Sequence, residues 1–465
     1  MNIRLFLKIA ATLVVAVLLL IPVEQIRALV NEREQTRDSV VQEIARSAGY
    51  AQTITGPLLI VPYTRKVRSW SQEGEERERR LVETEVLGRL AILPTDFELS
   101  GDIPIEERQR GIYRARLFNA DTRITGRFQI EPDYGIPTEQ LADYTFDSPR
   151  LVLGISDTRG IGNALELRWN GKRIPFEPGA HPPMLPSGVH AQLPVEGVTS
   201  EQSVAFSIGL SLQGTSDLQV TPVGRESRVM LTSNWPHPSF VGDILPQERE
   251  VSDGGFSARW QTSFFATNLE NIVNACAEVA SDSPGCADLA TRRFGVSFID
   301  PIDHYLKSER ATKYAFLFIG LTFAVFFLFE VLRRLSVHPI QYGLVGMALA
   351  VFFLLLLSFS EHFGFARAYL ISAFACVALV GYYVAHVVRD ARLGVAFGAG
   401  LGALYGVLYA ILSAEDYALL AGSLVVFAVL GAIMVLTRKV NWTNYGQASE
   451  AIPRPASVTD GKPAA

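Results

Sequence analysis

The sequence lacks the motifs that mark the common exported hydrolases. Its 465 residues contain no H-E-x-x-H, no G-x-S-x-G and no S-x-x-K arranged before a helix. The histidines between the apolar ends of the chain are too scattered for a recognisable zinc spacing; they are His181, His190, His237 and His304. The sequence therefore predicts no catalytic residue, no metal site and no cofactor.

Positive charge is not in excess either. The chain has 42 Lys and Arg against 47 Asp and Glu, a net charge of -5, and no aromatic RNA-binding motif. This balance makes nucleic acid an unlikely class of partner. The run Gly398-Ala399-Gly400 follows no strand and lies inside an apolar segment, so it does not predict a nucleotide-binding loop.

Cysteine is scarce, with three residues in the chain. Cys276 and Cys286 flank a stretch rich in Asp, Ser, Pro and Gly that can turn back on itself, which favours a disulfide in an oxidising compartment such as the bacterial periplasm. Two unpaired thiols are the alternative. Cys376 lies inside an apolar run, where a small side chain is typical of helix packing.

What the sequence has instead is a series of long apolar runs after Lys313. Each is about 20 residues long, the length that an α-helix needs to cross a bilayer. The runs are residues 314–332, 341–360, 368–388, 393–412 and 417–436. They are continuously apolar rather than alternating, so they predict transmembrane helices and not barrel strands.

The charges between these runs alternate in sign and so predict an orientation. Short cytoplasmic loops retain Lys and Arg, which places the ends that carry Arg333, Arg389 and Arg438 in the cytoplasm. The ends that carry Glu361 and Glu415 then face the other side.

A sixth apolar run, residues 5–23, begins the chain beside Arg4 and Lys8. A cleaved signal peptide has a similar start, but this run ends in Leu-Leu-Leu-Ile-Pro-Val with no A-x-A pattern, which favours an uncleaved anchor in residues 1–23. Six spans place both termini in the cytoplasm of a bacterial inner-membrane protein.

The segment between the first two spans must then be periplasmic. Residues 24–55 predict a helical stalk, and residues 56–313 predict a β-rich domain, because short strands of Val, Ile, Leu and aromatic residues alternate with Gly, Pro, Asn and Asp. Asn170-Gly171 and Asp253-Gly254-Gly255 are typical of hairpin turns. We expect a large antiparallel β-sandwich, in one lobe or two. The five C-terminal spans form a bundle over residues 314–436, and residues 437–465 read as a disordered cytoplasmic tail.

Ionisable residues at the membrane edge are the candidate polar sites, since a charge in lipid is costly. Glu330 lies near Arg333 and Arg334, where an interfacial ion pair is favoured over a proton or ion site. A second group comprises Glu361, His362 and Arg367. This group can bind a ligand or titrate, or it can be an ordinary solvated loop.

One predicted span carries glycine at every fourth position, at Gly394, Gly398, Gly402 and Gly406. All four lie on one helix face, and small residues there let a neighbouring backbone approach closely. The pattern predicts tight helix packing or a homo-oligomer interface.

Several segments together resemble one family. They are residues 154–160 (Gly-Ile-Ser-Asp-Thr-Arg-Gly), 235–240 (Trp-Pro-His-Pro-Ser-Phe), 293–303 (Arg-Phe-Gly-Val-Ser-Phe-Ile-Asp-Pro-Ile-Asp) and 338–342 (His-Pro-Ile-Gln-Tyr). The sequence resembles the CreD family of inner-membrane proteins over almost its whole length, apart from the tail. The resemblance implies a role in cell-envelope integrity and envelope stress response, with no established catalytic residue.

The resemblance also marks Asp300, Asp303 and Arg310 as a junction between the β-rich domain and the second span. The leading interpretation is a non-enzymatic protein whose periplasmic domain binds an unknown envelope protein or cell-wall component, anchored in the lipid bilayer. A transporter or channel that uses the helix bundle is the alternative. An exported glycan-modifying enzyme would need carboxylate pairs that the sequence does not place.

Overall fold

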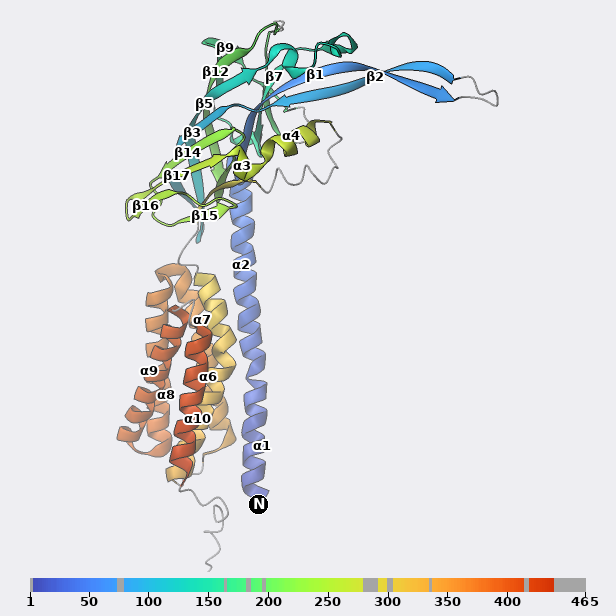
Figure 1. Cartoon of the computed structure of the whole chain (residues 1–465). Coiled ribbons are helices and arrows are strands. Elements are labelled where there is room, and N and C mark those ends of the chain that lie inside the picture. The colour runs from blue at the N-terminus through green and yellow to red at the C-terminus, as the bar shows by residue number, and fades with distance from the viewer. Residues whose placement is uncertain are drawn as a thin grey trace, which may run out of the picture. The chain divides into compact units, whose positions relative to one another are not determined.

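The computed structural model describes residues 3–72, 79–162, 165–180, 185–194, 198–278, 292–298, 304–333, 337–413 and 418–438. The chain divides into two compact units (Figure 1). We call Met1–Thr36 with Ile302–Ala465 the helical unit, and Arg37–Pro301 the β unit.

The helical unit is built from long apolar helices. Their bounds are α1 Ile3–Leu18, α2 Leu20–Ala48, α6 His304–Arg333, α7 Pro339–Phe363, α8 Phe365–Val388, α9 Ala391–Ser413 and α10 Ala418–Thr437. Helix α2 begins in the helical unit and ends in the β unit, since the boundary falls between Thr36 and Arg37.

Five helical stretches among the described residues are long and apolar enough to cross a membrane. They are Ala10–Ala48, His304–Phe327, Pro339–Phe363, Phe365–Val388 and Ala391–Ser413. The predicted span at residues 417–436 coincides with α10, whose described apolar run, Leu420–Ala432, is shorter. A total of six spans therefore stays a prediction.

Local sequence explains where the helices of this unit begin and end. His338 caps α7 with its ring nitrogen, Pro339 occupies the first turn, and Gln341 reaches back to the His338 N–H at 3.0 Å. Gly364, at φ 78°, separates α7 from α8. The helices bury a continuous aromatic and aliphatic cluster in which Tyr405 donates to Sγ of Cys376 at 3.2 Å.

The β unit contains two sheets of nine strands each within its described residues. The first has the order β10 (Glu177–Pro178), β11 (Gly188–Gln192), β7 (Arg150–Ile155), β1 (Gln52–Gln72), β13 (Asp217–Thr221), β18 (Phe294–Phe298) and β15 (Pro238–Gly242), with β2 (Arg79–Ile92) and β6 (Tyr144–Phe146) also paired to β1. The second has the order β16 (Glu248–Ser252), β17 (Gly255–Ser263), β14 (Glu226–Ser233), β3 (Asp96–Asp102), β5 (Tyr113–Ile130), β12 (Gln202–Thr215), β8 (Glu166–Trp169) and β9 (Lys172–Pro175), with β4 (Ile105–Arg110) on β5.

Short helices connect some of these strands. They are η1 Pro132–Gly135, η2 Leu141–Asp143, η3 Thr158–Gly160, α3 Phe264–Thr267 and α4 Leu269–Glu278. Strand β1 pairs with β2 from Leu59 opposite Ile92 to Gln72 opposite Arg79, and this ribbon extends beyond the rest of its sheet (Figure 1).

Both predicted hairpins are confirmed. Asn170 and Gly171 adopt φ 48° and 80° between β8 and β9, as a type I′ turn requires. The second hairpin joins β16 to β17, where Ser252 lies opposite Gly255.

The expectation of purely antiparallel sheets is wrong at two pairings. Strand β1 runs parallel to β13, and β3 runs parallel to β14. Parallel neighbours need long crossover connections, and here the partners are far apart along the chain. Local turn signals therefore could not reveal them.

One buried cluster joins the two sheets. Trp260 of β17 stacks on Phe294 of β18 at 5.4 Å between ring centroids, and Phe118 of β5 packs on Phe298 of β18 at 5.6 Å. Because these pairs connect one sheet to the other, the β unit has one shared core. Its assignment as a β-sandwich remains a prediction.

Candidate functional site: a polar joint at the end of helix α2

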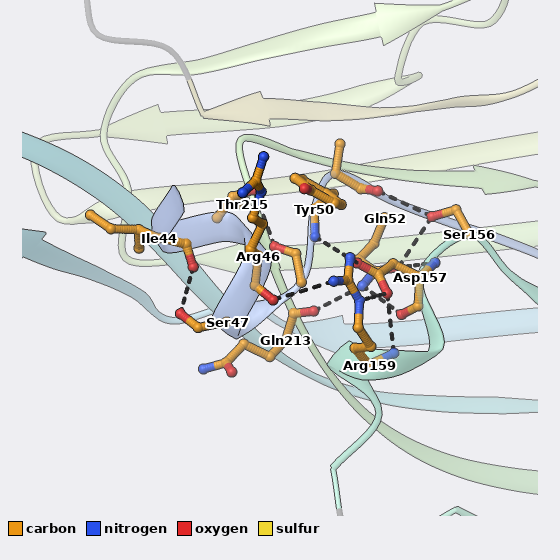
Figure 2. Close-up of polar contacts among 12 residues, drawn as sticks. Ile44, Arg46, Ser47, Tyr50, Gln52, Ser156, Asp157, Arg159, Gln213 and Thr215 are labelled. Carbon is orange, nitrogen blue, oxygen red and sulfur yellow. Dashed lines mark hydrogen bonds and ion pairs between the residues drawn. The ribbon is translucent and has the colours of Figure 1, made fainter. Parts of the chain in front are cut away.

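Helix α2 ends in the β unit at a network of polar residues (Figure 2). Three segments that are distant in sequence contribute to it: residues 46–52, residues 156–160, and the end of β12. We call this network the joint. It comprises Arg46, Gly49, Tyr50, Gln52, Ser156, Asp157, Arg159, Gly160, Gln213 and Thr215.

Gln52 lies at the centre of the joint and is completely buried. Its amide nitrogen donates to the carbonyls of Asp157 and Gln213, each at 3.0 Å. Its amide oxygen accepts from the Asp157 N–H and the Ser156 hydroxyl, each at 3.2 Å. All four hydrogen-bonding positions of the amide are used, so the side chain fixes β1 to the 156–160 turn and to β12.

Asp157 and Arg159 form a bidentate ion pair beside Gln52. Nε of Arg159 donates to Oδ1 at 2.9 Å and Nη2 donates to Oδ2 at 2.8 Å. The Asp157 carboxylate also accepts from the N–H of Tyr50 at 3.0 Å and of Arg159 at 3.2 Å. The Arg159 side chain, followed by these main-chain donors, holds the pKa of Asp157 below its usual range.

Arg159 connects this pair to the helix. Its Nη1 donates to the carbonyl of Arg46 at 3.3 Å, in the last turn of α2, and its guanidinium lies over the Tyr50 ring at 5.0 Å. Carbonyl groups at a helix C-terminus carry partial negative charge and have no partner within the helix. A cation at this position therefore stabilises the end of α2.

Two glycines allow the segments to approach closely. Gly49 terminates α2 at φ 102°, a conformation that favours glycine, and its carbonyl accepts from the Thr215 hydroxyl at 3.2 Å. A β-carbon on Gly160 would collide with the carbonyl oxygen of Gln213. The joint therefore depends on close backbone contact as well as on polar side chains. Its groups are engaged with one another, which suits a structural connection better than catalysis.

Of the predicted membrane-edge residues, Glu361 has the best-defined surroundings. Its side chain in α7 is 10% exposed, accepts from the Tyr305 hydroxyl of α6 at 3.2 Å, and lies 3.9 Å from Nε of Arg33 in α2. This contact is within the helical unit and involves the same helix that ends at the joint. His362 and Arg367 are exposed and do not join it.

Glu330 is also buried, with 4% of its surface exposed. Its carboxylate accepts from the Tyr342 hydroxyl at 2.8 Å and from the Val337 N–H at 3.1 Å. These bonds link the end of α6 to the start of α7. The side chains of Arg333 and Arg334, the predicted partners, lie outside the described part of the chain.

The glycine pattern of α9 divides into two halves. A β-carbon on Gly394 would collide with Ala385 of α8, and one on Gly398 would meet Gly381 at 3.7 Å. Gly402 and Gly406 face open space. The first half therefore packs against α8, and the predicted homo-oligomer interface stays a prediction for the second half.

The remaining predicted residues are described only in part. Cys276 is buried in α4 and disulfide-bonded, whereas its predicted partner, Cys286, lies outside the described residues. Cys376 is a buried free thiol. Asp300 and Asp303 of the predicted junction also lie outside the described residues, and Arg310 is half-buried in α6.

Comparison with known proteins decides the family. A family model described as "Inner membrane protein CreD" matches residues 4–443. The protein described as inner membrane protein CreD of Escherichia coli (strain K12) is 36% identical over 439 residues, which cover 94% of each chain. The chain belongs to the CreD family of inner membrane proteins. The expectation from the sequence is thereby confirmed, and CreD is a family of membrane proteins rather than a named enzyme family.

Solved structures add no further argument about CreD. An M1 zinc metallopeptidase from Deinococcus radiodurans is 11% identical, covers 37% of this chain and 39% of its own, and has a TM-score of 0.19. A mutant of that enzyme bound to a Tyr-Ser-Ala substrate has a TM-score of 0.20, with 12% identity and coverage of 37% and 40%. Scores of this size establish no shared fold or activity.

One of the segments that resemble the CreD family forms part of the joint. Residues 154–160, which supported the resemblance, supply Ser156, Asp157, Arg159 and Gly160 to it. Sequence reasoning missed Gln52 and Gln213 as their partners. The only signal was a polar Gln52 at the start of an apolar strand, and no local pattern indicates what such a residue contacts.

Proposed function

We propose that this protein is a six-span protein of the bacterial inner membrane that holds its β unit in the periplasm and supports cell-envelope integrity there. Both termini are cytoplasmic in this proposal, as the Lys and Arg distribution favours. The β unit binds a component of the envelope, and the protein acts without catalysing a reaction.

The joint is the observation that carries this proposal. Within the β unit, Arg159, Gln52 and Gly49 fix the end of α2 to both sheets. Within the helical unit, Arg33 of the same helix pairs with Glu361 of α7. Helix α2 therefore has one defined contact near its middle and one at its C-terminal end, and a continuous helix held at two such points transmits force or rotation. The proposed role of α2 is therefore to couple binding at the β unit to the membrane bundle.

Breaking the joint tests this role. The double variant Asp157→Ala with Arg159→Ala removes the bidentate pair and the bond to Arg46. We expect the full-length variant to insert at normal levels and to lose the ability to restore resistance to envelope stress in a strain that lacks the native gene.

A matched control uses another ion pair of the β unit. Arg127 contacts Asp96 with the same groups, Nε and Nη2, at 3.0 and 2.8 Å, but this pair is on β5 and β3, away from α2. The variant Asp96→Ala with Arg127→Ala should retain full function. Equal function in both double variants, at equal expression, would refute coupling through the joint.

Transport through the helical unit is the second candidate function. Its support is the buried carboxylate of Glu330, because an ionisable group in a membrane bundle is often functional. The bonds that Glu330 accepts from Tyr342 and Val337 are also sufficient to explain it as a structural residue. Replacing the bundle with unrelated membrane helices distinguishes the two: retained function would exclude transport.

A further inference from the structure

The β unit contains a cavity of about 570 Å³ where the β8–β9 edge of one sheet meets β11 of the other. Apolar residues such as Leu59, Leu193 and Val204 form part of its lining. The half-buried rings of Trp169 and Tyr134 and the side chain of Lys172 also line it. Within the described part of the chain, the Trp169 indole N–H has no hydrogen-bond partner in the protein, and the exposed Lys172 ammonium forms no ion pair.

The backbone at Tyr134 is strained. Asp133 and Tyr134 adopt φ 48° and 57°, a left-handed conformation that is costly for a bulky residue. Tyr134 packs edge-on against Phe146 at 5.0 Å, which holds its ring at the cavity. Strain of this kind persists where surrounding contacts impose it, and it is frequent at ligand sites.

A second cavity of about 530 Å³ adjoins the first at Ser148 and Gln192. Arg150 and Gln192 are direct neighbours across β7 and β11, so their side chains lie on the same face of the sheet. Arg89 is on the adjacent ribbon, opposite Pro62. Both arginines line this cavity.

These arginines have no acidic partner among the described residues. Neither Arg89 nor Arg150 forms an ion pair, and the Nε of Arg150 is buried without a hydrogen-bond partner. The exposed Asp147 also lines the cavity but makes no ion pair with them. Planar guanidinium groups that are left unpaired in a cavity are suited to carboxylate or phosphate.

We propose that the two adjoining cavities form one binding site for an anionic saccharide. The ring of Trp169 packs against the apolar C–H face of a sugar, while Lys172, Gln192 and Trp169 supply hydrogen bonds to its hydroxyl and acetamido oxygens. Arg150 and Arg89 bind its carboxylate or phosphate. The inference rests on the proposed function, because it names the class of envelope component that the β unit recognises.

A saccharide fits this site better than an acidic peptide. The first cavity has no carboxylate in its described lining and combines an aromatic face with planar amides, from Asn170, Gln192 and Gln202. That combination matches a ring with one apolar face and a hydroxylated rim. Lys172 and Arg173 line the first cavity, but Arg173 is paired with Glu166, whereas the two arginines without an acidic partner among the described residues lie together in the second cavity, which predicts a ligand with a localised anionic group at that end.

Binding to the purified full-length protein in detergent tests the proposal. The probes are N-acetylmuramic acid, N-acetylglucosamine 6-phosphate, N-acetylglucosamine and an acetylated, amidated tri-glutamate peptide. We expect at least one anionic sugar to bind about tenfold more tightly than the neutral sugar, which is the effect of one charge-assisted contact. The sugar that binds more tightly identifies the source of the anion as a carboxylated or a phosphorylated glycan.

Variants locate the site. Arg150→Met should weaken binding of the anionic sugar about tenfold and leave binding of the neutral sugar unchanged. Trp169→Leu should weaken binding of both. Arg168→Met changes a neighbouring exposed arginine of β8 that lines neither cavity, so it should have no effect. Thermal denaturation of each variant verifies that it is folded.

Several results would overturn the proposal. They are no binding of any sugar, equal binding of neutral and anionic sugars, tighter binding of the peptide, or an Arg150→Met variant that binds like the unaltered protein. None of these would refute the proposed function, which is judged separately by the envelope-stress phenotype of the joint variants.

Discussion

The carboxylate of Asp157 and the guanidinium of Arg159 form two parallel hydrogen bonds of 2.9 and 2.8 Å, and the same guanidinium donates to the last turn of α2. The pair therefore serves two purposes: it satisfies an acidic side chain that is largely shielded from solvent, and it fixes a helix C-terminus. In the coupling proposed above, this contact makes the end of α2 move with the β unit.

Gln52→Ala should lower the stability of the β unit. It leaves the N–H of Asp157 and the carbonyls of Asp157 and Gln213 without their buried partner, which costs about 1–3 kcal/mol. Thermal denaturation in detergent measures the loss. Gln261→Ala, at an exposed position of β17, is the control and should change the melting temperature little.

Asp157→Asn should change how stability depends on pH. The folded protein lowers the pKa of Asp157 below its unfolded value of about 3.9, so the carboxylate stabilises the fold above that pH and loses this effect as pH falls through the lowered pKa. The difference in melting temperature between the unaltered protein and the variant should therefore shrink from pH 7 to pH 3. A constant difference would contradict the role of the charge.

Gly160→Ala should destabilise the joint by overpacking. The added β-carbon would collide with the Gln213 carbonyl, and such strain costs about 1–3 kcal/mol. Gly209→Ala in β12 meets nothing within 4 Å and serves as the control. Chemical denaturation of both variants compares them, and equal stability would show that the close approach is unimportant.

Glu330→Leu should destabilise the helical unit more than Glu330→Gln does. Leucine removes the acceptor for Tyr342 and Val337, at about 1–3 kcal/mol, while glutamine can still accept from Val337 and donate to the tyrosine oxygen. The melting temperature of the detergent-solubilised protein separates the variants. A stable Glu330→Gln protein without function would favour transport.

Alkylation followed by mass measurement tests the predicted disulfide. In the denatured, unreduced protein only Cys376 should react, and after reduction all three cysteines should. Reaction of all three without reduction would show that Cys276 and Cys286 are not paired in the isolated protein.

The features predicted from the sequence are those set by local pattern. Asn170-Gly171 determines its hairpin because both residues tolerate positive φ, and the long apolar runs determine helices α7, α8 and α9. The parallel pairing of β1 with β13 has no such signal. The pairing depends on which distant strand completes the sheet. For example, Gln52 in β1 lies opposite Leu218 in β13, which is far from it in sequence.

The sequence predicts some residues of the candidate site but not the residues that they contact. Residues 154–160 were recognisable as a family segment, but their contacts with Gln52 and Tyr50 join positions more than a hundred residues apart, as the separations of 105 and 107 show. Glu361 was identified from its position at a membrane edge, whereas its partners Arg33 and Tyr305 come from two other helices. Contacts between such distant residues depend on tertiary packing, and the periodicity of the sequence does not predict them.

Labelling of introduced cysteines in intact cells tests the central claim most directly, because that claim requires the β unit to lie outside the cytoplasm. In a Cys376→Ala background, Glu250→Cys on β16 should react with a membrane-impermeant maleimide in intact cells. Arg392→Cys, in the first turn of α9, should react only after the inner membrane is permeabilised. The opposite pattern, with Arg392→Cys labelled in intact cells and Glu250→Cys protected, would contradict the account.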